Sequence, residues 1–268
     1  MCYDISFSTR VEDLKDYLPD LEIDRQARFE FGSLDHVQAQ GAPQYPVITF
    51  EDNHYKLKPF EWGVIAPYMR TAEEIKKGRN STANARSEKI VDDHRSLWYR
   101  MRKNRCLIPV TGIFEHREIK GWKKKVPYLI SEKRRSLFCI PGLYNYPHVA
   151  NPETGEIKGT FALITRPANT VMKQIHNSGP NAGRMPLFLN KELEQKWLLP
   201  DLSDEEIKEV LSYEVASEKL KQYPVYTIRS NKPRPDDKDI LEPYKWPDLP
   251  PLGTQNPDRK EAEPKDAD

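Results

Sequence analysis

The chain has 268 residues, of which 37% are hydrophobic and 31% charged, and its formal net charge is +1. This length suits one large domain or two small ones. No apolar run is long enough to cross a bilayer, and the start of the chain lacks the basic and apolar stretches of a secretory signal, so we expect a cytoplasmic protein with no membrane association. The three cysteines show no C-x-x-C spacing, which argues against a disulfide framework and a structural zinc site.

Charge is distributed unevenly along the chain. From Asp236 onward there are ten acidic and five basic residues, which leaves residues 1–235 with a net charge of +6. Basic clusters at 76–79, 100–105, 123–125 and 133–135 are each typical of a solvated surface, but together they are compatible with a polyanionic partner. We expect a single domain over residues 2–235, then an acidic, proline-rich extension over 236–268 that is predicted to be disordered at its end, from Pro250.

Hydrophobic spacing and turn residues predict helices and strands in a mixed order. An amphipathic helix is expected over residues 8–31 with a break at Pro19, and Thr71-Ala-Glu-Glu74 has the pattern of a helix start with a capping box. Strands are predicted at 45–50, 61–67, 105–114, 127–130, 137–140 and 160–165, and short helices at 189–197 and 203–211, the second capped by Ser203 and Glu206. This order predicts an α+β fold with a mixed, largely antiparallel, barrel-like sheet flanked by helices.

The cysteine at position 2 offers unusual chemistry. If Met1 is removed, the chain begins with Cys2, whose free α-amine and thiol form a 1,2-aminothiol. An α-amine titrates near ~7.7–8.0, so a useful fraction is uncharged at neutral pH and can condense with an aldehyde. The adjacent thiol can then trap the imine as a five-membered thiazolidine. The alternative is that position 2 is an ordinary position with no function of its own.

Two further segments place a titratable residue where core or turn residues are expected. The apolar run that starts at Arg105 ends in Glu115, and a carboxyl set against an apolar wall has a raised pKa that suits proton transfer near neutrality. His176 precedes a loop rich in glycine and proline that could present it to a ligand. A salt-bridged glutamate at a strand end and a hydrogen-bonded structural histidine are the competing interpretations.

Asn84 and Arg86 form a third candidate pair, because an amide and a guanidinium two residues apart can position a sugar and pair with a phosphate. Helix-cap and surface roles are equally ordinary for them. The six histidines are scattered without metal-ligand spacing, and there is no phosphate-binding glycine motif or serine-hydrolase elbow. We therefore expect no metal and no nucleotide cofactor.

Several of these segments, taken in order, resemble the SOS-response-associated peptidase (SRAP) family over roughly residues 2–230. The resemblance is carried by Cys2, Trp62-Gly-Val-Ile-Ala-Pro67, Asn84-Ala-Arg86-Ser-Glu88, Arg105-Cys-Leu-Ile-Pro with Gly112-Ile-Phe-Glu115, Pro141-Gly-Leu-Tyr144, and Ala168-Asn169 with Ile175-His176 and Arg184-Met185-Pro186. It implies a DNA-repair protein that binds single-stranded DNA as a monomer, associates with the nucleoid when bound, and links itself covalently to abasic sites.

The resemblance also implies a role for each matching residue. Cys2 would form the thiazolidine with the abasic-site aldehyde, Asn84 would orient the sugar, and Arg86 would hold a neighbouring phosphate. Glu115 would handle the protons of imine formation, and His176 would serve in sugar ring opening and in reversal of the crosslink. The remaining DNA contacts would come from Trp62, Arg184, Met185 and Pro186, with base stacking by Trp62 or Tyr68. A lyase-type activity and an autopeptidase (protease) activity belong to the same expectation.

The chain departs from the usual family pattern at two places. Tyr3-Asp4 stands where many members have Gly-Arg, and seven residues separate His176 from Arg184 where the family usually has one. Two other functions stay open on the residues alone. One is a cysteine peptidase or amidase in which Cys2 attacks an acyl group. The other is a non-catalytic module that binds single-stranded DNA.

Overall fold

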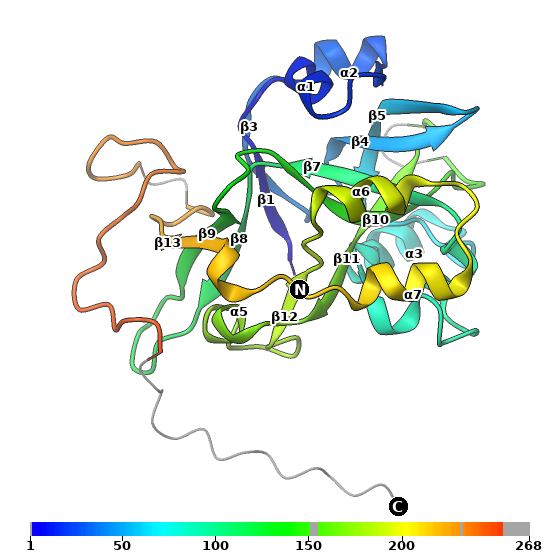
Figure 1. Cartoon of the computed structure of the whole chain (residues 1–268). Helices are drawn as coiled ribbons and strands as arrows, with labels where there is room; N and C mark the ends of the chain where they lie inside the picture. Colours follow the sequence, from blue (N-terminus) through cyan, green and yellow to red (C-terminus); the bar gives the residue numbers. More distant parts are fainter. Residues whose placement is uncertain (1, 151–154, 231–232, 254–268) are drawn as a thin grey trace, which may run out of the picture.

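Two β-sheets organise this chain (Figure 1). A computed structural model describes residues 2–150, 155–230 and 233–253. Sheet A is antiparallel, with the strand order β13-β9-β8-β1-β3. Its strands are β1 (Asp4–Phe7), β3 (Leu34–Gln38), β8 (Gly112–Arg117), β9 (Val126–Glu132) and β13 (Leu220–Pro224).

Sheet B has the order β12-β11-β10-β7-β4-β5-β2, and an additional pairing of β11 with β5 closes part of it into a ring. Its strands are β2 (Glu22–Ile23), β4 (Gln44–Glu51), β5 (His54–Trp62), β7 (Arg105–Val110), β10 (Phe138–Asn145), β11 (Thr160–Pro167) and β12 (Arg184–Pro186), and β6 (Asn84–Arg86) pairs with β11 in parallel. Most of its pairings are antiparallel, so the predicted α+β fold with a barrel-like sheet is confirmed.

The chain passes between the two sheets several times, and one of these changes falls inside a predicted strand. The strand predicted at 105–114 is two strands, β7 in sheet B and β8 in sheet A, separated at Thr111, whose N–H donates to the carbonyl of Ser6. The strand predicted at 61–67 was misplaced, because β5 ends at Trp62. Gly63 has a φ of +104°, and a Cβ there would lie 2.8 Å from Cγ of Arg79, so only glycine fits this turn.

The helix predicted over residues 8–31 was wrong, although the break predicted at Pro19 is confirmed, because α1 ends before it. The segment forms a 3₁₀ turn (Val11–Asp13), the one-turn helix α1 (Leu14–Tyr17), strand β2 and α2 (Arg25–Glu30). Pro19 lacks a donor for helical hydrogen bonding, and Ile23 instead pairs with Leu57 of β5. Tertiary pairing therefore overrides the helical spacing of the apolar residues.

Three of the remaining helices lie close to their predicted positions, namely α3 (Ala72–Gly78), α6 (Lys191–Leu198) and α7 (Asp204–Ser212). The helices α4 (Leu97–Met101) and α5 (Thr170–Ile175) were not predicted, and 3₁₀ turns lie at Arg79–Thr82, Ser87–Lys89 and Ser217–Lys219. Both predicted capping boxes are confirmed, with Thr71 and Glu74 starting α3 and Ser203 and Glu206 starting α7. Within the described residues, no helix has the length and the apolar character that a membrane crossing requires.

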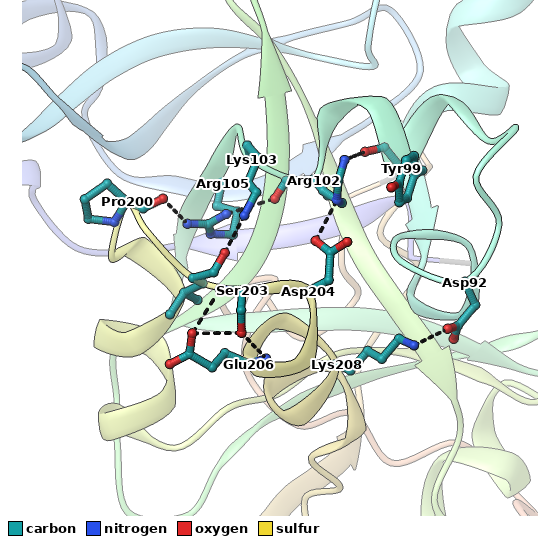
Figure 2. A network of polar contacts seen from close by, with 11 residues as sticks. Asp92, Tyr99, Arg102, Lys103, Arg105, Pro200, Ser203, Asp204, Glu206 and Lys208 are labelled. Carbon is teal, nitrogen blue, oxygen red and sulfur yellow. Dashed lines mark hydrogen bonds and ion pairs between the residues drawn. The ribbon is translucent and has the colours of Figure 1, made fainter.

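Polar contacts fix α6 and α7 to the rest of the domain (Figure 2). The buried Arg105 guanidinium donates to the carbonyls of Trp197, Leu199 and Pro200 at the end of α6. Arg102 reaches the Asp204 carboxylate at 2.7 Å at the start of α7. The Arg105 contacts satisfy carbonyls that the end of α6 leaves without intrahelical partners.

One large apolar core lies between the sheets and the helices. Trp62 and Trp197 are fully buried in it, and the Trp197 indole N–H donates to the carbonyl of Cys106 at 3.1 Å. Gly142 in β10 lies so close to its neighbours that a Cβ would be 2.6 Å from the Ala162 carbonyl oxygen. This close approach lets β10 pack between β7 and β11.

Residues 233–253, which we call the strap, follow the domain and pack on it. Tyr244 N–H donates to the Pro224 carbonyl, and the Trp246 indole N–H donates to the carbonyl of Val225 at 2.9 Å. In Figure 1 the strap is the orange to red segment on the sheet A side. The expected disorder at the end of the chain concerns residues that, from position 254 on, lie outside the described residues.

Candidate functional site

The start of the chain leads into the interior beside β6 and β8. Cys2 is fully buried, and its carbonyl accepts a hydrogen bond of 2.9 Å from the Asn84 amide nitrogen. Its Sγ lies 3.5 Å from the Asp4 carbonyl. Burial, followed by the nearby Glu115 carboxylate, raises the pKa of the Cys2 thiol well above its ordinary value. The thiol is therefore protonated at neutral pH.

Glu115 lies on β8 next to Cys2 and is almost fully buried. Burial in this apolar surrounding raises the pKa of its carboxyl to about 7. Its Oε1 atom and the Asn84 Oδ1 atom are both buried, and neither has a hydrogen-bond partner among the described residues. Since unpaired buried acceptors cost about 1–3 kcal/mol each, these two atoms are suited to hold a donor that arrives with a ligand.

His176 is the C-cap of α5 and is 9% exposed. Its Nδ1 lies 2.7 Å from the carbonyl oxygen of Arg184, which can only accept, so Nδ1 carries the proton and Nε2 is left as an acceptor. Burial is the main cause that lowers the pKa of His176, to about 4. The imidazole is therefore neutral near pH 7 and can act as a base.

The long loop after His176 does not displace the histidine from Arg184. The N–H of Gly183 donates to the His176 carbonyl at 2.7 Å, so the seven-residue loop begins and ends at the same place. Gly179 and Gly183 have positive φ angles, which supply the turns of this loop. Within the loop, Asn181 accepts a hydrogen bond from exposed Arg86 at 3.0 Å.

An open cavity of about 310 Å³ brings several of these side chains together, and we call it the Glu115 pocket. It is lined by Tyr3, Asp4, Glu115, His116, Lys125, His176, Ser178, Pro180, Asn181 and Arg229. Among these, the sequence reasoning found Glu115 and His176 but missed Lys125 and Arg229. No local signal pointed to Arg229, because it lies 225 positions from the residue that holds it.

That residue is Asp4, which stands where many SRAP members have arginine. Its buried carboxylate lies 2.8 Å from His36 Nε2 and accepts from Arg229 Nε at 3.0 Å. Although burial alone would raise the pKa of Asp4, these two partners lower it. Asp4 is thus ionised and draws a cation from the far end of the domain into the pocket.

The other predicted DNA contacts lie apart from the pocket. Arg184 is 9% exposed and forms an ion pair with Glu88, with Nη2 2.9 Å from Oε2, and the same nitrogen donates to the Thr165 carbonyl. Met185 and Pro186 are buried in β12. These three residues position the segment around His176 and offer little surface to a ligand.

Trp62 is also inaccessible. Its indole stacks against Phe161 with ring centroids 5.9 Å apart, and its N–H donates to the Ala83 carbonyl. A fully buried ring cannot stack on a base, so direct stacking by Trp62 is a prediction that the structure contradicts. Tyr68, the other aromatic considered for stacking, is 63% exposed.

No group of three or more histidine, cysteine, aspartate or glutamate residues within the described ranges has the arrangement of a metal site. The chemistry available is that of a buried aminothiol position, a carboxyl that titrates near neutrality, a neutral histidine and nearby cations. Such a set can move protons around a nucleophile attached to the chain itself.

The family model described as SOS response associated peptidase (SRAP) matches residues 1–231. Two curated relatives carry the name abasic site processing protein. One, YMR114C of Saccharomyces cerevisiae, is 29% identical over 61% of this chain and 41% of its own length. The other, HMCES of Pongo abelii, is 23% identical over 70% of this chain and 56% of its own. The matched regions thus span roughly half the length of these relatives.

Solved structures show the same fold. A crystal structure of a protein from Bacteroides thetaiotaomicron is 31% identical, with a TM-score of 0.72, and the match covers 90% of this chain and 97% of that one. A protein from Bordetella bronchiseptica shares 19% identity with a TM-score of 0.67, over 84% of this chain and 100% of that one.

Proposed function

Because the chain belongs to the SOS response associated peptidase (SRAP) family, we propose that it processes abasic sites in DNA. In this proposal it binds single-stranded DNA at the Glu115 pocket and captures the aldehyde of the ring-opened deoxyribose through Cys2 once Met1 has been removed. The two curated relatives named abasic site processing proteins support the general activity. The covalent chemistry is argued from the geometry around residue 2.

The observation that carries the proposal is the pair of unpartnered, buried acceptors beside residue 2. Glu115 Oε1 and Asn84 Oδ1 have no hydrogen-bond partner among the described residues, whereas Asn84 Nδ2 already holds the Cys2 carbonyl. Sugar hydroxyls and a protonated amine are the donors that such acceptors would receive. Both atoms are therefore suited to orient the sugar and the α-amine of Cys2.

Electrostatics favours attack by the amine before the thiol. Burial keeps the thiol protonated, whereas an α-amine is partly uncharged near neutral pH. The amine nitrogen would bond to the aldehyde carbon and the oxygen would leave as water, which gives an imine. The sulfur would then bond to the imine carbon while the thiol proton passes to nitrogen, which closes the thiazolidine. Glu115, with a pKa of about 7, can accept and return the protons of the first step.

Peptide hydrolysis is supported less well at this site. A cysteine nucleophile that attacks an amide acts as a thiolate and is activated by a lowered pKa, but the Cys2 pKa is raised. Aldehyde capture by an amine does not need a thiolate for its first step. The geometry therefore favours the aldehyde over the amide as the electrophile.

A denaturing gel tests the proposal. After intact mass confirms loss of Met1, the protein is incubated with single-stranded DNA that carries one abasic site. We expect a band that survives denaturation without borohydride for the wild type. Cys2→Ser keeps the amine but cannot close the sulfur ring, so its band should require borohydride. If protein that starts at Cys2 gives no such band, or if Cys2→Ser gives an equally stable one, the thiazolidine mechanism is wrong.

A further inference from the structure

A second, larger cavity lies outside the proposed site. It has a volume of about 1110 Å³ and is bordered by the end of β1, the loop between β9 and β10, the start of α6, and β13. We call it the basic cleft. Four of its lining residues are cations without an ion-pair partner among the described residues, namely Lys133, Arg134, Lys191 and Lys221.

The carboxylates around the basic cleft are mostly engaged elsewhere. Glu132 pairs with Arg135, and Asp13 pairs with Arg10, so Asp16 is the one lining carboxylate for which the described residues show no ion pair. The cleft therefore carries an excess of about three positive charges after internal pairing. An excess of this kind attracts an anion with several charges.

The walls of the cleft supply neutral hydrogen-bonding groups and fixed cations. The hydroxyls of Ser6, Ser8 and Thr111 form a cluster in which Ser6 Oγ and Ser8 Oγ lie 3.1 and 3.0 Å from Thr111 Oγ1. Lys191 lies over the Tyr17 ring at 5.4 Å, and Lys221 lies over the Tyr223 ring at 5.2 Å. These ring contacts restrict the two ammonium groups to the cleft, which lowers the entropic cost of using them for a ligand.

The basic cleft and the Glu115 pocket flank the same apolar cluster on sheet A. This cluster contains Phe114, Leu129, Val225 and Ile228, with Tyr223 and Leu241 packed against it. Leu129, Tyr223 and Leu241 line the basic cleft, whereas Arg229, the residue after Ile228, lines the Glu115 pocket. A strand of nucleic acid that leaves the pocket along this face would meet the four cations.

We propose that the basic cleft binds a ligand that carries several phosphate groups, and that these are backbone phosphates of a nucleic-acid strand. Hydroxyl groups and cationic side chains bind phosphate oxygens without contacting base edges, so binding at this cleft is independent of nucleotide sequence. The identity of the strand as the abasic-site DNA rests on the proposed function. Phosphate binding itself does not depend on it.

The test compares two charge reversals of equal size. Lys133→Glu with Arg134→Glu alters the basic cleft, and Lys76→Glu with Lys77→Glu alters exposed positions of α3 that do not line it. Binding of a fluorescein-labelled 25-nucleotide oligo-dT strand without abasic sites is followed by anisotropy, and binding of inorganic tripolyphosphate by calorimetry. Circular dichroism checks the fold, and Lys133→Gln with Arg134→Gln replaces the cleft variant if the reversal unfolds the protein.

We expect the cleft variant to bind the oligonucleotide at least about tenfold more weakly than the α3 variant. Two lost contacts to a single strand should also reduce the slope of log K against log salt by about 1.4, since each contributes about 0.7. If the cleft variant weakens the binding of tripolyphosphate but not of the oligonucleotide, the cleft binds phosphate groups, and its assignment to a nucleic-acid strand is wrong. If neither probe is weakened beyond the α3 control, the whole inference is wrong.

Discussion

The raised pKa of Glu115 makes the unfolding free energy of the protein depend on pH, and this dependence can be measured. Its pKa is raised from 4.5 to about 7 by burial, so the folded state holds a proton that the unfolded state has already released in this interval. The contribution to stability is present below pH 4.5 and is lost as the pH rises to 7. At about 1.36 kcal/mol per pH unit the loss amounts to about 3 kcal/mol.

Glu115→Gln should therefore change both stability and reactivity. As the pH rises from 4.5 to 8, the wild type should lose about 3 kcal/mol of unfolding free energy relative to the variant, as measured by urea denaturation. Crosslinking to abasic-site DNA should slow by about a hundredfold or more. Glu118→Gln, which changes an exposed carboxylate, is the control. An unchanged crosslinking rate in Glu115→Gln would remove Glu115 from the mechanism.

His176 should stay neutral across the pH range in which Glu115 titrates. Its pKa is lowered from 6.5 to about 4, mainly by burial, so its contribution to stability is present above pH 6.5 and is lost as the pH falls to 4. Nitrogen-15 NMR should show a neutral ring with the proton on Nδ1 at pH 6. His176→Ala should slow reversal of the crosslink more than its formation, whereas exposed His148→Ala should change neither. A ring that protonates near pH 6.5 would contradict this assignment.

Chemical character identifies some site residues from sequence and misses others. Cys2, Asn84, Glu115 and His176 stood out because each is a reactive or polar group in an unexpected context, and the structure brings them to one region. Arg229 had no such context, since its position depends on a partner at residue 4. Base stacking by Trp62 was predicted because an aromatic residue in a family motif looks the same in sequence whether it packs in the core or faces a ligand, and Trp62 is buried.

At the scale of elements, Arg105 is expected to hold the end of α6 in place. Arg105→Ala would leave the carbonyls of Trp197, Leu199 and Pro200 without this donor, and each such loss costs about 1 kcal/mol or more. We expect the unfolding free energy to fall by about 2–4 kcal/mol in urea titrations. Arg100→Ala, on an exposed neighbour, should stay within about 0.5 kcal/mol of wild type. Equal stability of the two variants would show that water replaces the guanidinium.

Local rules predicted the elements whose signals are local. The capping boxes before α3 and α7 were found because side chain and backbone partners lie three residues apart. The helix prediction for residues 8–31 was wrong because strand β2 in this segment forms only through its pairing with β5. Strand β1 was missed for a similar reason, since its four residues are all buried and show no alternation. Elements defined by distant partners leave little trace in the local pattern.

At the scale of the whole molecule, the sequence predicted a barrel-like sheet but not how it closes. Closure depends on the parallel pairing of β11 with β5, in which Phe161 lies beside Trp62. The strap was assigned to an acidic extension because its composition is polar and rich in proline. Its few aromatic residues nevertheless pack on sheet A, and the family match ends at residue 231, before the strap begins.

The strap should add measurable stability to the domain it covers. Trp246 stacks on Tyr226 at 6.1 Å, lies 6.3 Å from Trp122 and donates to the Val225 carbonyl, so Trp246→Ala removes apolar burial and a hydrogen bond together. Because the ring is only partly buried, we expect a loss of about 1–3 kcal/mol in urea denaturation and faster proteolysis within residues 233–253. The neighbouring exposed Lys245→Ala should change neither. If Trp246→Ala matches Lys245→Ala in both measurements, the strap lies on the domain without stabilising it. The stable domain then ends after β13, near Arg229.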